Sequence, residues 1–88
     1  MSSTVHERVL TVEPVAINAW VENRIVHVEL YDDRVLSFPA RKFMRLSNAE
    51  DDLLAKVRIR AQGSALRWDD LDEDISVEGI EQGIFEAD

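Results

Sequence analysis

The sequence RIVHVELYDDRVLSF at residues 24–38 contains the most regular pattern in the chain. Its first half alternates between apolar and polar side chains, which is typical of a β-strand with one buried face. The apolar positions are Val26, Val28 and Leu30. His27 and Glu29 would then lie on the other, half-exposed face. Residues 32–33 supply turn chemistry, so we expect a hairpin whose second strand covers residues 34–38.

Extended segments also precede this hairpin. Residues 15–21 are consistent with a strand that reaches the hairpin through a turn at residues 22–23. Residues 9–12, with the sequence VLTV, predict a further short strand. We expect residues 1–8 to form a flexible tail and residues 1–88 to form a single domain, because chains of this length hold one hydrophobic core.

A helix is expected near residues 48–56. The sequence Ser47-Asn-Ala-Glu50 fits a capping box, in which a serine hydroxyl and a glutamate satisfy free amides at the start of a helix. Asp51 and Asp52 would follow in the first turn, where the helix dipole favours negative charge. The side chains expected to face the core are Leu53, Leu54 and Val57.

The sequence after this helix predicts two strands. Residues 57–61 have a period of two, and the inward positions would be Val57, Ile59 and Ala61. Residues 62–64 form a turn, and residues 65–68 are expected to be the last strand. An acidic loop over residues 69–74 follows.

A second short helix is expected near the end of the chain. Ser76 is a suitable N-cap, and a helix that begins there would continue through Gln82. Gly83 then suits the left-handed residue that often ends a helix. Strands, helix, strands and helix in this order predict an α+β fold, in which a small, mostly antiparallel sheet packs with two short helices.

The composition excludes several classes of function. The 88 residues include no cysteine, which excludes disulfides, thiolate zinc sites and a cysteine nucleophile. No segment approaches the ~18 apolar residues of a membrane span, and residues 1–8 lack the apolar run of a signal peptide. We therefore expect a cytoplasmic protein without a membrane partner. A homodimer stays open, because small domains often gain stability by dimerising.

The net charge of −8 is unevenly distributed. Residues 1–40 carry six acids and three bases, residues 41–67 carry three acids and seven bases, and residues 68–88 carry nine acids and no base. The overall charge opposes binding to nucleic acid. In one interpretation the basic middle segment pairs with the acidic end inside the molecule. In the other, the acidic end binds a basic surface on another protein.

Metal and catalytic motifs are incomplete. Oxygen-bearing side chains have the spacing of a calcium-binding loop at Asp70, Asp72, Asp74, Ser76, Glu78 and Glu81. Ile75, however, occupies the position at which that loop needs glycine. His6 and His27 are far apart in sequence, and neither has a second ligand at metal-binding spacing. We expect no catalytic residue, no cofactor and no metal site.

The resulting hypothesis is a non-enzymatic protein-interaction domain whose acidic end contacts a basic partner protein. Trp20 and Trp68 suit core or rim positions, but an exposed tryptophan is also a common anchor in such interfaces. The partner-binding candidates are Trp68, Asp69, Asp70, Asp72, Glu73, Asp74 and Glu78. One alternative is a carboxylate-based metal-dependent binder or small hydrolase. Another is a nucleic-acid accessory protein that uses Arg41, Lys42, Arg58 and Arg60.

Residues 33–83 also resemble a known family of small bacterial proteins, the domain of unknown function 2442. The matching pieces are Asp33-Arg34, Phe38-Pro39, Arg45-Leu46, Asn48-Ala49, Arg58-Ile59, Gln62-Gly63 and the string WDDLDEDISVEG at residues 68–79. The family usually has Asp-Gly where this chain has residues 32–33, and often His-Trp-Pro where it has residues 67–69. The resemblance implies a compact α+β domain. Some members look like one half of a toxin–antitoxin-like pair, which implies a partner-binding, antitoxin-like role.

Overall fold

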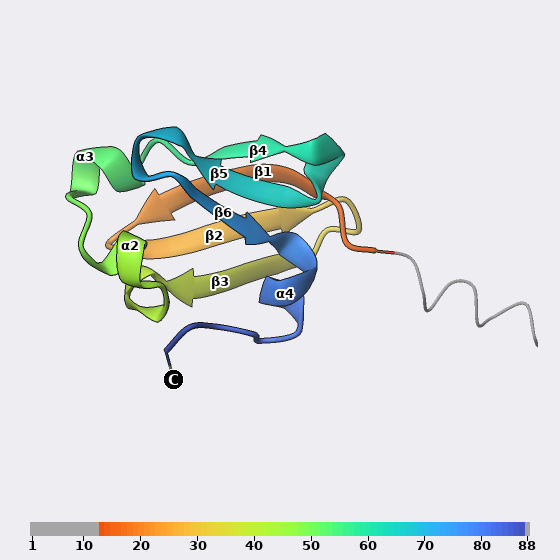
Figure 1. Ribbon diagram of the computed structural model, residues 1–88. Helices are drawn as coiled ribbons and strands as arrows, with labels where there is room; N and C mark the ends of the chain where they lie inside the picture. The colour runs from red at the N-terminus through yellow and green to blue at the C-terminus, as the bar shows by residue number, and fades with distance from the viewer. Residues whose placement is uncertain (1–12, 88) are drawn as a thin grey trace, which may run out of the picture.

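The computed structural model describes residues 13–87, so the predicted tail at 1–8 and the predicted strand at 9–12 lie outside the described residues. The strands form two three-stranded antiparallel sheets (Figure 1). The first sheet contains β1 (Ala16–Glu22), β2 (Ile25–Leu30) and β3 (Val35–Pro39). The second sheet contains β4 (Arg58–Arg60), β5 (Ala65–Trp68) and β6 (Glu73–Ser76). The predicted α+β class is confirmed, and the antiparallel strands are divided between two sheets.

Short helical segments connect the strands. They are η1 (Ala40–Lys42), α2 (Met44–Ser47), α3 (Asp51–Leu54), η2 (Ala61–Gly63), η3 (Asp69–Leu71) and α4 (Val77–Glu81). Both α2 and α3 lie in the connection between the two sheets, whereas α4 directly follows β6 (Figure 1). Within the described part of the chain, no helix is long and apolar enough to cross a membrane.

The hairpin of β2 and β3 forms as the alternation predicts. Val26, Val28 and Leu30 are at most 1% exposed, whereas His27 is half-buried. Asp33 lies in the turn with φ 74°, a left-handed conformation that aspartate adopts more readily than most residues. The buried face fixes the register, because a shift by one residue would turn all three apolar side chains toward solvent.

The hydrophobic core lies between the two sheets and is closed by the helices. Its fully buried large side chains are Trp68, Phe38, Leu30, Leu46, Leu54, Leu66, Val26, Val28 and Val77. Trp68 is 1% exposed, and its indole N–H donates a 2.9 Å hydrogen bond to the carbonyl oxygen of Leu54. The prediction that Trp68 is an exposed interface anchor is therefore wrong. Trp68 joins the second sheet to α3 inside the core.

The helix predicted at residues 48–56 begins later than the capping box indicates. Ser47 is the last residue of α2, and its backbone N–H donates to the carbonyl oxygen of Phe43 at 2.8 Å. The N-cap residue of α3 is Glu50, which makes no side-chain capping bond. The capping-box prediction is wrong because Ser47 already belongs to the preceding helical turn.

Arg24 holds the connection between α2 and α3. Its guanidinium donates hydrogen bonds of 3.0–3.2 Å to three backbone carbonyl groups and forms a 2.7 Å ion pair with Asp51. The three carbonyl groups belong to Leu46, Ser47 and Ala49. These carbonyls lie at the break between two helices, where the regular intrahelical bonds end. The carbonyl of Leu46 also accepts the backbone N–H of Ala49 at 3.2 Å. A local sequence motif does not reveal this contact, because Arg24 is 22 to 27 positions away from its partners.

The acidic segment forms a hairpin instead of the predicted loop, and β5 is not the last strand. After η3, Asp72 adopts φ 52° and the chain returns as β6, which pairs with β5. Glu73 and Ile75 are buried, whereas Asp74 and Ser76 are exposed. The two-residue period of a strand is therefore present in the sequence, but the run of acids conceals it. We call residues 69–74 the acidic hairpin.

The turn before β5 is left-handed. Ala61, Gln62 and Gly63 have φ values of 55°, 57° and 91°. Ala61 is exposed, so its predicted inward position is wrong. A Cβ atom at Gly63 would lie 2.6 Å from Cγ1 of Val15 and 2.8 Å from the carbonyl oxygen of Ala16. Glycine at this position therefore allows both the backbone conformation and the close approach of η2 to β1.

The last helix has the predicted caps. The hydroxyl oxygen of Ser76 accepts a 3.1 Å hydrogen bond from the backbone N–H of Gly79. At the other end, Gly83 adopts φ 75° and donates to Ile80, while Ile84 donates to Gly79. These two bonds form a Schellman motif, which satisfies carbonyl groups at the end of α4.

Gly63→Ala and Gly83→Ala together test the close approach of η2 to β1. Both glycines have positive φ, but no heavy atom lies within 4 Å of a Cβ at Gly83. Gly83→Ala should lower the free energy of unfolding by about 1 kcal/mol through backbone strain alone. Gly63→Ala should cost about 1–3 kcal/mol more, because its methyl group also overlaps neighbouring atoms. Urea denaturation measures both values, and equal losses would contradict the described packing.

Candidate functional site

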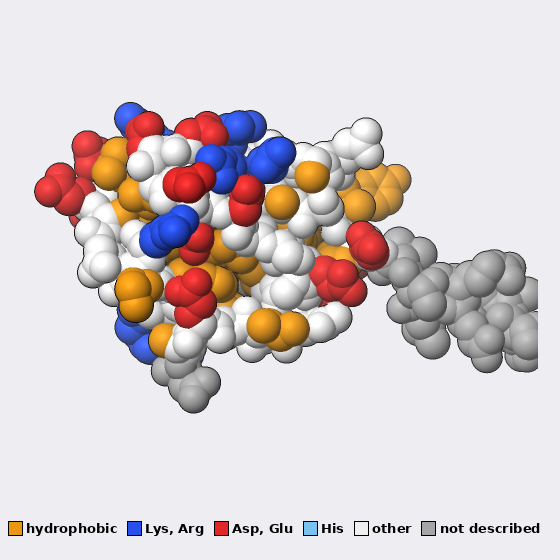
Figure 2. Space-filling view, viewed as in Figure 1, with side chains coloured by type: hydrophobic (Ala, Val, Ile, Leu, Met, Phe, Trp, Pro, Cys, Tyr) orange, Lys and Arg blue, Asp and Glu red, His pale blue; other side chains and the backbone are white. Residues whose placement is uncertain are grey.

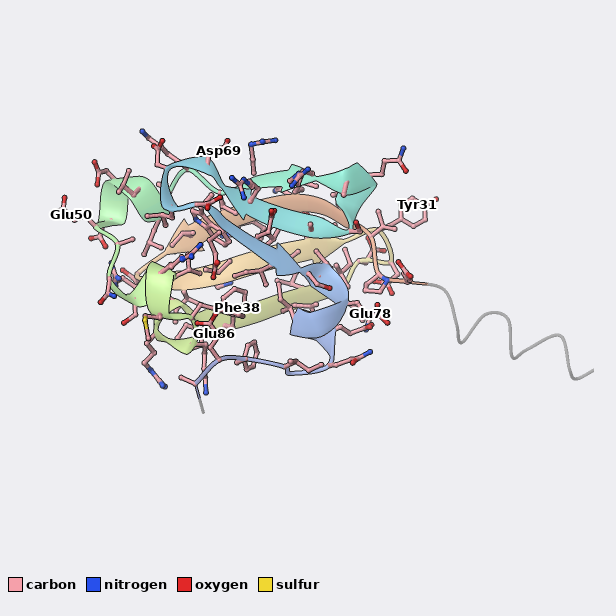
Figure 3. The ribbon with its side chains drawn as sticks, in the orientation of Figure 1. Tyr31, Phe38, Glu50, Asp69, Glu78 and Glu86 are labelled. Carbon is pink, nitrogen blue, oxygen red and sulfur yellow. The ribbon has the colours of Figure 1, made fainter. Side chains whose placement is uncertain are left out.

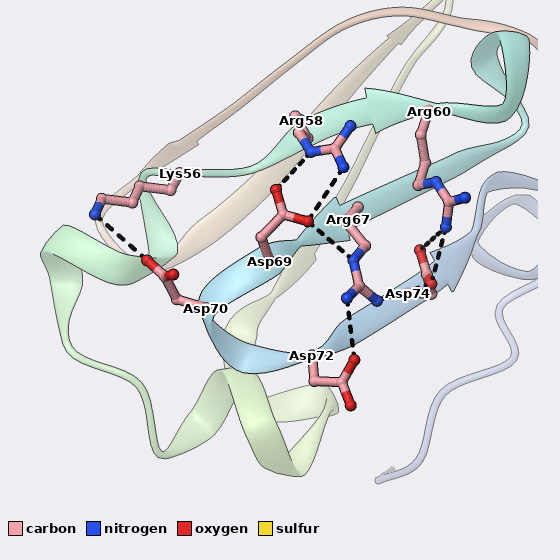
Figure 4. Close-up of polar contacts among 8 residues, drawn as sticks. All are labelled: Lys56, Arg58, Arg60, Arg67, Asp69, Asp70, Asp72 and Asp74. Carbon is pink, nitrogen blue, oxygen red and sulfur yellow. Dashed lines mark hydrogen bonds and ion pairs between the residues drawn. The ribbon is translucent and has the colours of Figure 1, made fainter.

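An ionic network covers the outer face of the second sheet (Figure 4). In the strand register, Arg58 lies opposite Arg67, and Arg67 lies opposite Asp74. Two like charges in directly opposed positions destabilise a sheet unless a counter-charge separates them. Asp69 provides this charge: it accepts hydrogen bonds from Nε of Arg58 at 2.7 Å and from Nε of Arg67 at 3.1 Å.

The other aspartates of the acidic hairpin also have cations of the same chain as partners. The ion pairs are Asp70 with Lys56 at 3.4 Å, Asp72 with Arg67 at 3.0 Å, and Asp74 with Arg60 at 3.2 Å and Arg67 at 3.0 Å. Red and blue side chains accordingly mix over β4 and β5 in the upper part of Figure 2. The interpretation that the basic middle segment pairs with the acidic end is confirmed.

The two arginines change the ionisation of Asp69. Hydrogen bonds from Arg58, and then from Arg67, lower the pKa of the Asp69 carboxyl group from 3.8 to about 2. The same contacts raise the pKa values of the two arginines. The hydrogen bond that Arg58 donates to Asp69 is the largest cause that raises the pKa of Arg58, and the one that Arg67 donates to Asp72 is the largest for Arg67. Asp69, Arg58 and Arg67 therefore stay ionised at neutral pH.

Glu73 differs from the aspartates because it is only 9% exposed. Burial, and then the negative charge of Glu86, raise the pKa of the Glu73 carboxyl group, while Arg45 acts in the opposite direction. Nη1 of Arg45 lies 3.9 Å from Oε1 of Glu73 and also donates to the carbonyl oxygen of Asp72. Glu73 is thus the one buried carboxylate of the acidic hairpin, and it offers little surface for contact with a partner protein.

The acidic hairpin consequently presents less free charge than its composition suggests. Glu78, the remaining sequence candidate, lies on α4 away from Asp69 (Figure 3), and it accepts a 3.3 Å hydrogen bond from Gln82. For the nucleic-acid hypothesis, Arg58 and Arg60 are already bound to aspartates. Among residues 13–87, no group of three or more histidine and carboxylate side chains is placed to hold a metal ion.

The outer face of the first sheet has a different character. Nine residues from three strands form it, and we call it the open face. They are Asn18, Trp20, Glu22, Ile25, His27, Glu29, Val35, Ser37 and Pro39. All nine are half-buried or exposed, whereas the residues of the opposite face are buried in the core or packed against it. The open face is thus the solvent side of an antiparallel sheet.

An aromatic stack occupies the centre of the open face. Trp20 lies opposite His27, and their rings stack with centroids 5.3 Å apart and planes inclined by 23°. Nδ1 of His27 lies 2.7 Å from the hydroxyl oxygen of Ser37, its neighbour on β3. The indole N–H of Trp20 donates a 3.2 Å hydrogen bond to Glu22. These contacts hold the two rings in a fixed arrangement across the sheet.

The open face carries negative charge that nearby cations leave unneutralised. Neither Glu22 nor Glu29 forms an ion pair with another residue between 13 and 87, and none of the nine positions is lysine or arginine. The neighbouring bases in the chain are engaged elsewhere, since Arg24 binds Asp51 and Arg34 pairs with acids outside the open face. The acids bound by Arg34 are Asp32 and Glu81.

Alternation along β2 places His27 and Glu29 on an outer face, but it does not by itself connect them with Trp20 and Glu22. A signal was available, because a turn at residues 22–23 between two strands brings Trp20 opposite His27. The sequence pattern does not show which acids find internal partners. This information requires the three-dimensional arrangement of the charges.

The family model described as "Protein of unknown function (DUF2442)" matches residues 16–86. A crystal structure of a protein of unknown function from Rhodospirillum rubrum is similar, with 38% identity, a TM-score of 0.79, and coverage of 84% of this chain and 92% of that chain. A solution NMR structure of an uncharacterised protein from Chromobacterium violaceum has 20% identity, a TM-score of 0.73, and coverage of 94% of this chain and 78% of that chain. The latter shows the fold alone. No curated protein matches the chain.

The lowered pKa of Asp69 predicts a pH dependence of stability. A carboxyl group with a pKa of about 2 in the folded state, below its ordinary 3.8, stabilises the fold above the ordinary value. That stabilisation is lost as the pH falls from about 4 to about 2. In Asp69→Asn, the free energy of unfolding should therefore fall less over this window than in the unaltered chain. Urea denaturation at several pH values measures the difference, and parallel pH profiles would refute the assignment.

Proposed function

The chain belongs to the DUF2442 family, and from this premise we propose that it is a non-enzymatic, cytoplasmic interaction domain that binds a protein with a basic surface. The observation that carries the proposal is the pair of carboxylates, Glu22 and Glu29, beside the aromatic stack of the open face. Both lack an ion-pair partner among residues 13–87. The site therefore differs from the acidic hairpin, whose charges are internally compensated.

The chemistry of the open face favours a protein over other classes of partner. Its apolar and aromatic side chains offer area that can be removed from water, as in the centre of a protein interface. Its carboxylates attract cations and determine their orientation. Phosphate groups of nucleic acids or lipids would be repelled by the same carboxylates, so a basic protein surface fits best.

A neighbouring small protein is the first partner to test. The antitoxin-like role implied by the family resemblance requires one small protein to cover a functional surface of another. An acidic face fits this role when the covered surface is basic, because opposite potentials accelerate association and suppress incorrect partners. The protein encoded beside this chain is therefore the natural candidate for a direct binding assay.

The proposal predicts that binding depends on the open face and not on the acidic hairpin. The tagged chain is used to capture protein from its own cells at low and high salt, together with two matched variants. Glu22→Gln combined with Glu29→Gln removes two charges from the open face, and Asp70→Asn combined with Asp72→Asn removes two from the acidic hairpin. The first variant should lose most of the captured partner and the second should keep it. High salt should weaken capture by the unaltered chain.

Circular dichroism confirms that both variants are folded before capture is compared. Two results would overturn the proposal. One is capture that is equal in the open-face variant and the unaltered chain. The other is capture that is lost only in the acidic-hairpin variant, because the site would then lie on the second sheet.

A further inference from the structure

The accessible part of the Trp20 ring indicates which kind of partner side chain can bind there. One side of the indole is covered, because it stacks on His27 with the ring centroids 5.3 Å apart. Trp20 as a whole is half-buried, so part of its surface remains in contact with solvent. A planar cation can continue the stack on the opposite side of the ring. Tryptophan is the side chain that binds cations most strongly through its π-system.

Glu22 determines where the charge of such a cation lies. Its Oε1 accepts the indole N–H of Trp20 at 3.2 Å, which holds the carboxylate at the edge of the ring. A guanidinium that stacks on the indole directs its N–H groups sideways, toward that edge. Arginine can then form two parallel hydrogen bonds with a carboxylate while its plane lies on the aromatic ring.

Glu29 extends the negative charge to the other side of the stack. It follows His27 by two residues on β2, so it lies on the same face as the two rings. Glu22 and Glu29 thus flank the aromatic pair along the strand direction. Arg24 and Arg34, the bases next to this face in the described part of the chain, are already bound to other acids, so both carboxylates can accept a cation from a partner.

We propose, on the basis of the proposed function, that the open face binds an arginine-bearing segment of the partner protein. One guanidinium stacks on Trp20 and pairs with Glu22, and further cations lie near Glu29. Lysine is a poorer match, because its ammonium is a compact, strongly hydrated charge that neither stacks nor forms a two-bonded fork. Arginine preference is therefore the distinguishing property of the site.

NMR titration of the ¹⁵N-labelled full chain tests this proposal. The probes are two short capped peptides that alternate glycine with arginine or glycine with lysine. The indole N–H resonance of Trp20 should shift with the arginine peptide, at an affinity about threefold or more above that of the lysine peptide. The indole of Trp68 is the internal control, because it is buried and bonded to Leu54. Its resonance should not move.

Matched charge variants locate the contact. Glu22→Gln preserves the size of the side chain and should weaken the arginine peptide about threefold to tenfold. Asp70→Asn removes the same charge from the acidic hairpin and should leave the affinity unchanged. Equal affinities for both peptides, or shifts centred on the acidic hairpin, would overturn the proposal. A Trp20 resonance that moves with protein concentration in the absence of peptide would also overturn it, because a second copy would then cover the face.

The two proposals can fail separately. Partner capture that requires Glu22 and Glu29, without any preference for arginine over lysine peptides, refutes the arginine site and leaves the proposed function standing. Capture that is independent of both glutamates refutes the proposed function as well.

Discussion

The charge pattern of the second sheet depends on the bridge that Asp69 forms between Arg58 and Arg67. The antiparallel register places these two arginines opposite one another on the outer face of the second sheet. Without a counter-charge, this arrangement would oppose strand pairing. The chain provides the charge locally, because the turn that follows β5 begins with Asp69 and reaches both guanidinium groups. The same turn leads into β6, so one segment provides both the compensating charge and the third strand of the sheet.

Because of this bridge and its neighbouring ion pairs, the acidic composition does not by itself indicate a binding surface. The nine acids of residues 68–88 suggest a surface for a basic partner, but the aspartates of the acidic hairpin already bind cations of the same chain. The molecule therefore has two outer sheet faces with different electrostatic properties. The face of the second sheet is internally compensated. The open face of the first sheet retains Glu22 and Glu29 beside an aromatic stack, which makes it the better candidate for binding.

Local patterns predicted the elements that local interactions determine. The β2–β3 hairpin follows from alternation, and α4 follows from its Ser76 cap and the glycine that ends it. The predictions were wrong for elements that depend on contacts with distant residues. Arg24, more than twenty positions away, contacts the chain at the start of α3. The strand β6 was concealed because Glu73, an acid, occupies one of its two inward positions. The sequence leaves Trp68 open between a core or rim position and an exposed anchor, and the structure places it in the core.

The candidate site shows the same limit of sequence analysis. Composition gives the number of charges, whereas binding depends on which of them remain without a partner after folding. Chemical modification of carboxyl groups by a carbodiimide and an amine, read by mass spectrometry, measures this directly. Asp69, Asp74 and Glu22 are all exposed, so exposure alone predicts similar rates. We expect Glu22 to react substantially faster than Asp69 and Asp74, whose carboxylates are bound by arginines. Equal rates at the three positions would contradict it.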